Sequence, residues 1–465
     1  MKGKVYLVGC GPGAPDLLTL RAVEVLQEAD VVLFDRLVDS EVLGHAENAE
    51  KIDVGKEPGE SEKQREINQL IYSKAEDGKV VVRLKNGNPA IFARGGEELR
   101  FLRKRGIAVE IVPGLSSATS LPPIHGIPLT MREVSSSLSI LSGYGAGGEE
   151  PRWREVGNTD VVLMTVGNLS RVVDRLLESG RSEETSCALI ISGTTERERL
   201  LVSSLSEVTE MAEEVGVEPP AILIVGDVVD ELLDLEGRTL AAFRPGREVE
   251  RTESLVEEAG ASPKIYSICE VDTSANSELA EALEEEWDVL VFMSSNGVRS
   301  AAELTDIPGR DVIAIGERTK AELEKLGCET IILPETRSSK GVEELLEGRG
   351  WKALALRSSM AEEDIECAKN VVAYSVEPRD VSGVLEDYLA EEPDFTLLTS
   401  SGVLKLLLEA AEEEGREERL EAQLDKTFLI SLGRRTTRTA LANDIWINYE
   451  LPRPNLEDFF RGNDQ

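Results

Sequence analysis

The sequence predicts an α/β protein built from several lobes, and three observations support this fold class. Short apolar strands alternate with amphipathic helices from Lys4 to about Val229, a rhythm typical of α/β architecture. A Gly-rich, polar stretch, Gly143 to Gly157, divides this series into two lobes. The second half carries a faint internal repeat, which predicts two more α/β lobes facing a shared cleft. The length of 465 residues allows about three domains.

The first element, Lys4 to Ala22, reads KVYLVGCGPGAPDLLTLRA and predicts a strand, a tight turn and a helix. The apolar run Val5 to Val8 breaks into glycines, and apolar residues then recur at helical spacing. Glycines allow positive φ angles and bring bare N–H groups against a ligand. The turn therefore indicates a flat or anionic ligand, although a tight strand-to-helix connection would need the same glycines.

Asp35 follows the second strand, about 20 residues after the Gly-rich turn. It fits three roles: a grip on a ribose hydroxyl, as in a dinucleotide-binding fold, a catalytic carboxylate, or a helix cap. Pro12 argues against a dinucleotide, because a phosphate-binding turn would need a free N–H there. Another turn, Asn86 to Pro89, directly follows a strand. Two such turns in one lobe indicate a ligand held by backbone from several sides.

The later strands of the first half are short apolar runs, and the last is followed by a connecting segment, Asp227 to Gly237. A new strand, Thr239 to Phe243, starts after it, so the domain boundary falls near Glu236. After the first element, the predicted strands of the first half are Val31–Phe34, Val80–Leu84, Val109–Val112, Leu138–Leu141, Val161–Met164, Ala188–Ile191 and Ala221–Val225.

The internal repeat of the second half pairs two kinds of turn. Phe292 to Val298 (FMSSNGV) resembles Leu397 to Val403 (LLTSSGV), and Ala314 to Thr319 (AIGERT) resembles Ile430 to Thr436 (ISLGRRT). Each copy reads as strand, hydroxyl-rich turn and helix, then strand, Gly, basic residue and helix. One interpretation is that these hydroxyls do no more than cap the helices that follow them. Their recurrence in both lobes favours a ligand-lined cleft.

Composition excludes several function classes. The formal charge is −37, from 88 acidic and 51 basic side chains spread along the chain, so nucleic acid is not an expected partner. We interpret this surface as an adaptation to a salty cytoplasm, where ions screen the self-repulsion. Only two histidines occur, neither in a ligand-spaced cluster, so we expect a carboxylate or the substrate itself to act as base.

The five cysteines are scattered and contain no C-x-x-C pair, so neither a disulfide framework nor a zinc site is indicated, and no metal is expected. No apolar run approaches the ~20 residues that span a bilayer, and the chain enters a strand at once, without a signal peptide. We therefore expect a cytoplasmic protein with no membrane partner.

The motifs of the first half together resemble uroporphyrinogen-III C-methyltransferase, of the tetrapyrrole methylase family. The resemblance implies two α/β lobes in residues 1–234, split near 114–144, and S-adenosylmethionine folded in the cleft between them. It also implies a homodimer formed through this half, and methylation of uroporphyrinogen III at C2 and C7 to give precorrin-2. The blocks that carry it are GCGPGAPDLLTLRA, DRLV, VGKEPG, RLKNGNPAIFARGGEE, VPGLSSA, GIPLTMR, LMTVGNL, SGTTERER and PPAILIVGDVV.

The resemblance also implies roles for individual residues. Asp35 takes the place of the proposed proton acceptor, and Lys56 that of the proposed proton donor. Aligning an electron-rich pyrrole carbon with the sulfonium methyl and moving a proton would suffice for this chemistry. The positions implied for the cofactor pocket are Pro12, Asn86, Gly87, Asn88, Ile91, Ser116, Ser117, Met164 and Gly193.

Four positions depart from the family pattern. Where the family usually has Gly-Gly-Asp-Pro, this chain has Asn86-Gly87-Asn88-Pro89, so an amide replaces a carboxylate that would attract the cofactor's positive groups. Met131 and Tyr144 replace histidines that are common in the family. These changes bear on cofactor affinity and on the porphyrinogen pocket more than on the fold.

Residues 237–465 resemble uroporphyrinogen-III synthase, through FRPGRE, SSNGV, AIGERT, LRSS, AYSVEP, TSSGV and SLGRRT. The resemblance implies lobe one from 237–268 plus 378–465, lobe two from 271–374, and a two-stranded linker. This family closes hydroxymethylbilane to uroporphyrinogen III with inversion of ring D. Tyr374 matches a tyrosine thought to assist departure of the hydroxyl, or it is a packed linker aromatic. Expected substrate contacts are Arg244, Arg247, Ser294, Asn296, Arg357, Thr399 and Ser400.

The two halves fit together chemically, because the product of the second is the substrate of the first. The sequence thus predicts a bifunctional tetrapyrrole enzyme that feeds sirohaem, cobalamin or related pathways. Alternatives are the same fold methylating another precorrin, or one half acting as a degenerate ligand-binding module. A nicotinamide-dependent dehydrogenase is disfavoured by Pro12 and by the later blocks.

Overall fold

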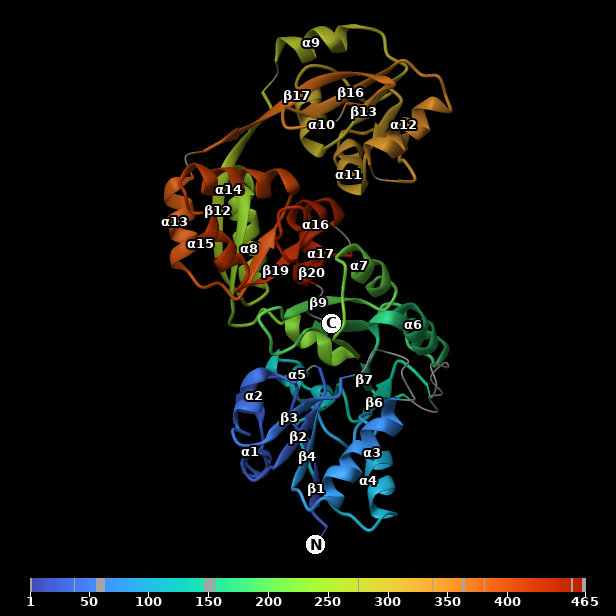
Figure 1. The fold of residues 1–465 in the computed structure, drawn as a ribbon. Helices are drawn as coiled ribbons and strands as arrows, with labels where there is room; N and C mark the ends of the chain where they lie inside the picture. Colours follow the sequence, from blue (N-terminus) through green and yellow to red (C-terminus); the bar gives the residue numbers. More distant parts are fainter. Residues whose placement is uncertain are drawn as a thin grey trace. The chain divides into compact units, whose positions relative to one another are not determined.

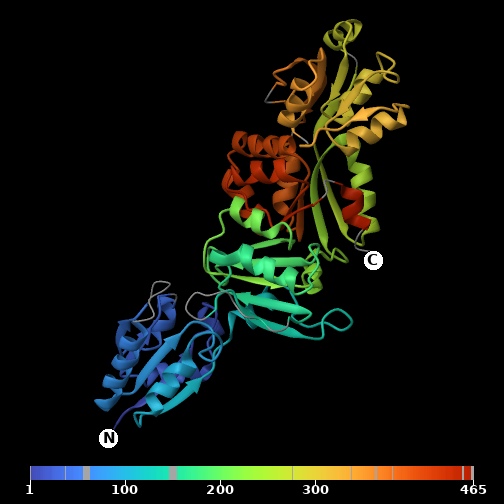
Figure 2. The same cartoon turned by 90° about the vertical axis from the view of Figure 1, so that its right-hand side faces the viewer.

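The computed structural model describes residues 2–36, 38–55, 63–145, 153, 156–274, 276–336, 338–361, 364–379, 381–452 and 455–461. The chain separates into two compact units. Unit 1 comprises Met1–Asp234 with Asn448–Glu450, and unit 2 comprises Leu235–Ile447 with Leu451–Gln465. Figures 1 and 2 show that each unit contains sheets covered by helices.

The first lobe of unit 1 is a parallel sheet in the order β3-β2-β4-β1-β5. Helices α1 and α2 cover one face and α3 and α4 cover the other (Figure 1), so both faces are buried, as parallel sheets require. The bounds are β1 Lys4–Gly9, η1 Pro15–Leu17, α1 Leu20–Gln27, β2 Val31–Phe34, α2 Ser40–Gly44, β3 Glu50–Asp53, α3 Lys63–Glu76, β4 Val81–Lys85, α4 Gly95–Arg103 and β5 Ala108–Val112.

The second lobe of unit 1 is a mixed sheet in the order β9-β8-β10-β7-β6. β6 is parallel to β7, whereas β7, β10, β8 and β9 pair antiparallel, and β20 pairs with β9. The bounds are α5 Ser117–Ile124, β6 Leu138–Ser142, β7 Thr159–Leu163, η3 Val166–Asn168, α6 Leu169–Glu178, β8 Ser186–Ile191, β9 Arg199–Ser204, α7 Val208–Glu214, β10 Ala221–Val225, η4 Asp227–Leu233 and β20 Tyr449–Glu450.

One lobe of unit 2 contains the parallel strand order β12-β11-β18-β19. Its core gathers Phe243, Tyr266 and Tyr388, whose rings lie within 6 Å of one another, centroid to centroid, as three contacts of 5.5, 4.9 and 5.9 Å. The bounds are β11 Thr239–Pro245, η5 Gly246–Glu248, α8 Val249–Glu258, β12 Ser262–Asp272, α13 Ser382–Ala390, β18 Phe395–Leu398, α14 Ser401–Glu413, α15 Glu417–Leu424, β19 Phe428–Ser431, α16 Arg434–Leu441 and α17 Leu456–Arg461.

The other lobe of unit 2 is a parallel sheet in the order β15-β14-β13-β16-β17. The long strands β12 and β17 leave the two sheets and pair antiparallel, from Cys269 opposite Pro378 to Asp272 opposite Ser375. The bounds are α9 Ser277–Glu284, β13 Val289–Phe292, α10 Ser295–Ala302, β14 Val312–Ala314, α11 Glu317–Lys325, β15 Ile331–Ile332, α12 Ser339–Glu347, β16 Ala353–Ser358 and β17 Ala368–Pro378.

The predicted α/β class is confirmed, and the strands Val31–Phe34 and Ala221–Val225 have the predicted bounds. The strand predicted to end at Met164 ends instead at Leu163, because Met164 has φ +60°, which no strand residue adopts. β3 and β9 were missed. β3 has the polar sequence EKID and exposes two of its first three residues, so it lacks the apolar run on which the prediction relied.

Candidate active sites

Three turns meet at the carboxyl edge of the first sheet, the place where open α/β sheets bind ligands. The N–H of Gly87 donates to the carbonyl of Gly11 at 2.7 Å, so the two turns lie side by side. A Cβ on Gly9 would lie 2.4 Å from the Gly87 carbonyl oxygen and 2.7 Å from the Gly114 nitrogen. Glycine is therefore required at position 9, where the turns following β1, β4 and β5 converge. This convergence brings Pro12, Asn86 and Gly87 to one edge.

The side-chain amide of Asn88 links two of these turns and also forms a hydrogen bond within its own turn. Its Nδ2 donates to the Gly114 carbonyl at 3.0 Å, and its Oδ1 accepts from the Ala90 N–H at 2.9 Å. Its carbonyl accepts from the Ile91 N–H at 3.1 Å, which places Ile91 in the same turn. An aspartate here would have no hydrogen to donate to Gly114. The structure thus gives a local reason for the amide that departs from the family pattern.

Ser116 and Ser117 stand at the start of α5, directly after the turn that follows β5. Ser116 is buried, and its carbonyl accepts from the Thr119 and Ser120 N–H groups at 2.9 Å each. Gly193, from the second lobe, packs against the same helix, because a Cβ there would lie 2.7 Å from a Leu121 methyl. α5 therefore lies against the serine turn of one lobe and the Gly193 loop of the other.

The loop after β8 also contacts the Gly-rich turn directly. The Ala14 N–H donates to Thr194 Oγ1 at 3.1 Å, and a Cβ on Gly13 would lie 2.8 Å from that oxygen. The two lobes of unit 1 thus meet where the sequence predicted cofactor residues. Thr194 was not predicted as a site residue.

Non-glycine residues with positive φ occur after β4, in the loop after β8, and at Met164 after β7. Met164 is 46% exposed with φ +60°, and its carbonyl lies 2.4 Å from where a Cβ on Gly143 would stand. Phe92 and Arg94 have φ of +48° and +58°, and Ser192 and Thr194 have +50° and +64°. Non-glycine residues with positive φ gather at functional sites, where the surrounding structure holds the strain. No local sequence signal reveals them, since each residue type ordinarily avoids this conformation.

Asp35 lies at the carboxyl end of β2, where its carboxylate is 32% exposed and is hydrogen bonded by Arg83 Nη2. Arg83 is almost fully buried, and its Nε lies 3.6 Å from Glu98 Oε1. Glu98 is fully buried and also accepts from Lys85 Nζ at 3.2 Å. Burial, with the neighbouring Arg83 charge, lowers the pKa of Lys85. This charged cluster, Asp35–Arg83–Glu98–Lys85, reaches the surface at Asp35.

Lys56, the predicted proton donor, lies outside the described residues. Part of the stretch Gly143 to Gly157, at 146–152 and 154–155, lies outside them too. The prediction that this stretch divides the two lobes is wrong, because β6 before it and β7 after it pair in the sheet of the second lobe.

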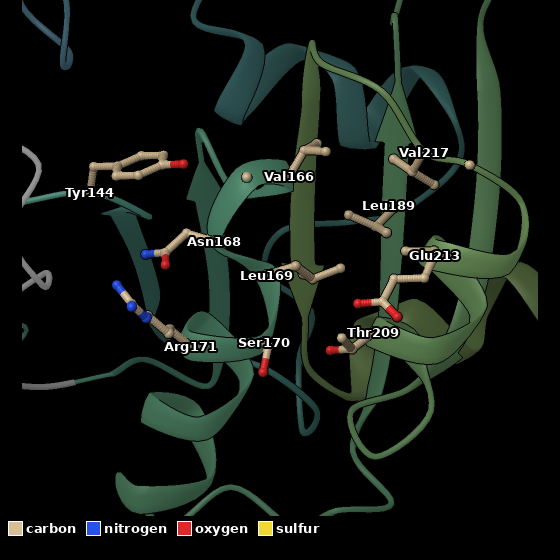
Figure 3. A pocket seen from close by; sticks show the side chains of 13 residues that line it. Tyr144, Val166, Asn168, Leu169, Ser170, Arg171, Leu189, Thr209, Glu213 and Val217 are labelled. Carbon is tan, nitrogen blue, oxygen red and sulfur yellow. The ribbon is translucent and has the colours of Figure 1, made fainter. Parts of the chain in front are cut away.

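A cavity of about 660 Å³ lies in the second lobe of unit 1, between α6, α7 and β8. In Figure 3, Tyr144, Asn168 and Arg171 stand on one side, and Thr209 and Glu213 stand on the other, with apolar side chains between them. Gly167 makes room for Tyr144, since a Cβ there would lie 2.5 Å from the phenol oxygen. Tyr144, which departs from the family pattern, thus lines this cavity, whereas the predicted cofactor residues are not part of its lining.

In unit 2, Tyr374 and Ser294 are brought together. Ser294 Oγ donates to the Tyr374 phenol oxygen at 3.0 Å and accepts from the Gly297 N–H at 3.3 Å, which caps α10. Tyr374 is only 8% exposed and packs in the lobe core through its ring. Its hydroxyl is therefore positioned by the strand–turn–helix junction that the sequence singled out.

Arginines from both lobes of unit 2 lie near this pair. Arg247 Nη2 donates to Asn296 Oδ1, and Arg318 Nη2 lies 2.9 Å from Glu248 Oε1. Arg244 is buried and pairs with the same Glu248. Burial, together with the nearby Arg299 charge, lowers the pKa of Arg247. Arg318 and Glu248 were not predicted as site residues, because nothing in a single sequence shows that two lobes bring them together.

The other predicted contacts hold local structure. Arg357 Nη1 donates to Asp364 and Asn370 at 2.9 and 3.1 Å. Thr399 Oγ1 donates to the Phe243 carbonyl at 3.0 Å, and Ser400 caps α14 by accepting from the Val403 N–H at 3.2 Å. The capping alternative accounts for the hydrogen bonds of Ser400.

Within the residues that the structure describes, no cluster of three or more His, Cys, Asp or Glu side chains could hold a metal ion. Among these same residues, none of the helices is both long enough and apolar enough to cross a bilayer.

The sheets and covering helices of these two units define a protein of the α/β class. Residues 4–209 match the tetrapyrrole (corrin/porphyrin) methylases, and residues 250–461 match the uroporphyrinogen-III synthase HemD family. The chain is a fusion that belongs to the uroporphyrinogen-III C-methyltransferase family through its first half and to the uroporphyrinogen-III synthase family through its second.

Three relatives illustrate this. Uroporphyrinogen-III C-methyltransferase of Methanocaldococcus jannaschii is 42% identical over 50% of this chain and 99% of its own length. The porphyrin biosynthesis protein HemD of Ruminiclostridium josui is 33% identical over 78% of each chain. The S-adenosyl-L-methionine-dependent uroporphyrinogen III methyltransferase of Methanosarcina barkeri is 42% identical over 49% of this chain and 92% of its own length.

Proposed function

We propose that this protein is a bifunctional enzyme of tetrapyrrole biosynthesis. Its second half closes hydroxymethylbilane to uroporphyrinogen III, and its first half methylates that product at C2 and C7 to give precorrin-2. The observation that carries the proposal is the match of one relative, the Ruminiclostridium josui HemD protein, across 78% of the chain and so across both halves. We assign the methyltransferase to residues 1–234 and the synthase to residues 237–465.

The turns at the first sheet edge fit S-adenosylmethionine. Three turns pack closely together at Gly9, Gly87 and Gly114, because a Cβ on Gly9 or Gly114 would lie within 2.4 Å of the Gly87 carbonyl oxygen, and this gathers their backbone at one sheet edge. Bound there, S-adenosylmethionine supplies an electrophilic methyl group. The residues that would hold it are Pro12, Asn86, Gly87, Asn88, Ile91, Ser116, Ser117, Met164 and Gly193.

The protein's part in methylation is alignment and proton transfer. Asp35, fixed by Arg83 and one-third exposed, accepts the proton released from the methylated pyrrole. Lys56 supplies a proton to the macrocycle. In the synthase half, the Tyr374 hydroxyl, held by Ser294, assists departure of the bilane hydroxyl, and arginines bind the substrate carboxylates.

The decisive experiment incubates the full chain with hydroxymethylbilane and S-adenosylmethionine and separates the products by chromatography. Precorrin-2 supports both activities. Uroporphyrinogen III without methylation contradicts the methyltransferase assignment. Uroporphyrinogen I alone, the product of uncatalysed closure, contradicts the synthase assignment.

Two further assignments accompany the proposal. We infer a homodimer formed through unit 1, supported by the exposed apolar side chains Leu20, Leu115 and Ile124. Light scattering on the full chain tests it, and a monomeric mass contradicts it. We also place the protein in the cytoplasm, because its cysteines are free thiols, as expected in a reducing compartment.

A further inference from the structure

The junction between the two lobes of unit 2 concentrates positive charge in a strongly acidic chain. Arg244 in β11 and Arg247 in η5 belong to one lobe, and Arg318, on α11, belongs to the other. Arg244 and Arg318 both form ion pairs with Glu248, and Arg247 precedes Glu248 in the chain. Burial raises the pKa of Glu248, but the charges of the three arginines lower it overall. Three arginines thus accompany one glutamate here, in a protein whose net charge is −37.

Among the residues that the structure describes, the charged groups next to this cluster already form ion pairs of their own. Arg299 on α10 has its own partner, Glu322, at 2.7 Å, and Glu270, beside Gly246, pairs with Arg379. Arg247 has the neutral Asn296 amide as its hydrogen-bond partner, so that contact leaves its charge uncompensated. The cluster retains attraction for further anions.

The two ion pairs of Glu248 differ in how readily they exchange. Arg244 is only 7% exposed, and its Nε donates a hydrogen bond to Thr252 Oγ1 at 3.1 Å. Because a buried charge without a partner is costly, Arg244 has to stay paired with an anion. Arg318 is 57% exposed, and water can replace its partner at little cost. A ligand carboxylate can therefore take Arg318 while Glu248 stays on Arg244.

The cluster also lies beside the reacting groups. Arg247 contacts Asn296 at the start of α10, whose cap Ser294 holds the Tyr374 hydroxyl at 3.0 Å. Tyr374 is close enough to Arg247 to affect its pKa. A polycarboxylate bound at Tyr374 would reach these arginines.

We propose that Arg318 binds a carboxylate of the synthase substrate, and that Glu248 takes the place of that carboxylate, clasping the two lobes, when no substrate is bound. This inference rests on the proposed synthase function. It adds to that function a substrate-binding residue and an internal competitor.

The test uses the full chain with Arg318→Gln, Arg318→Lys and Glu248→Gln. Lys320→Gln on the same helix and Glu250→Gln on α8 serve as matched controls. The readouts are kcat and KM for hydroxymethylbilane, and the Kd of uroporphyrin, an octacarboxylate that does not react, measured by its fluorescence.

Arg318→Gln is expected to raise KM and Kd about two- to fivefold, the effect of one exposed charge pair, with kcat unchanged. Arg318→Lys is expected to recover part of the loss. Glu248→Gln is expected to lower KM and Kd by a similar factor, because the competitor is gone, whereas the controls leave both constants unchanged.

The proposal is overturned if Arg318→Gln leaves KM and Kd unchanged, or if Glu248→Gln raises them as a purely structural residue would. Should Glu248→Gln fail to fold, the two Arg318 variants still decide. If the wild-type chain binds uroporphyrin through Arg318 but forms no uroporphyrinogen III, the proposed function is contradicted. The proposal that Glu248 and a ligand carboxylate compete for Arg318 then still holds.

Discussion

Asp35 shows how one carboxylate is held in place by partners that the chain brings from elsewhere. Its carboxylate sits at a strand end, about one-third exposed, and is hydrogen bonded by a guanidinium that is nearly fully buried. Such a charge-assisted bond is shorter and stronger than a neutral one and holds the carboxylate in one orientation. An ordinary helix cap would need no such support.

Asp35→Asn is expected to lower methylation about a hundredfold or more, since the amide cannot accept the proton. Ring closure should continue unchanged, because it occurs in the other unit. Both rates are followed in one reaction by chromatography, with the exposed Asp77→Asn as control. Equal loss of both activities would contradict this division of labour.

Asn88 is a second residue whose chemistry depends on its partners. Asn88→Asp places a carboxylate opposite the Gly114 carbonyl, which now receives the Asn88 amide hydrogen at 3.0 Å. We expect unit 1 to lose about 1 kcal/mol or more of stability without cofactor, because two acceptors face each other. Urea unfolding measures this, with exposed Asn48→Asp as control. Unchanged stability would show that the amide is not needed there.

At the scale of single elements, β4 carries two buried cations, Arg83 and Lys85. Arg83 and Lys85 are two residues apart on the strand, so their side chains share one face, and Glu98 on α4 lies against both. The Nε of Arg83 and Oε2 of Glu98 have no hydrogen-bond partner among the described residues. The helix and strand are thus joined by charge as well as by apolar packing.

Arg83→Met tests this element. Removing Arg83 leaves Asp35 without its cation and leaves Glu98 with Lys85 alone, and we expect a loss of about 3–5 kcal/mol in the free energy of unfolding. Urea unfolding compares it with Arg100→Met on exposed α4 surface. A loss below about 1 kcal/mol would mean that hydration stabilises the remaining charged groups about as well as Arg83 does.

The ion pairs of Glu248 with Arg244 and Arg318 predict how the stability of unit 2 depends on pH. Burial alone would raise the pKa of Glu248, but Arg244 and Arg318 hold it below its ordinary value. A lowered folded-state pKa contributes stability that is complete above the ordinary glutamate pKa and is lost as pH falls through the lowered one. The melting temperature of the wild type should therefore exceed that of Glu248→Gln at neutral pH and approach it in acid. If the difference between the two melting temperatures grew as the pH fell, this prediction would be contradicted.

At the scale of the whole molecule, the net charge of −37 opposes a substrate that is itself a polyanion. Salt screens this long-range repulsion over about 10 Å at 0.1 M and about 3 Å at 1 M, while the arginine cluster acts at contact distance. The apparent KM for hydroxymethylbilane is therefore expected to fall as salt rises from low to molar. Steady-state kinetics in a salt series checks this, and a KM that climbs throughout would contradict it.

The sequence by itself determined the α/β class, both families and the turns at the ends of β1 and β4. These features depend on local patterns: apolar runs make strands, glycines make turns, and parallel strands align their carboxyl ends. The tertiary structure decided which side chains act together. Arg83 reaches Asp35 from 48 residues away, and Arg318 reaches Glu248 from 70. Such pairs, like the positive φ of Met164, are set by packing between distant segments, which leaves no mark in the local sequence.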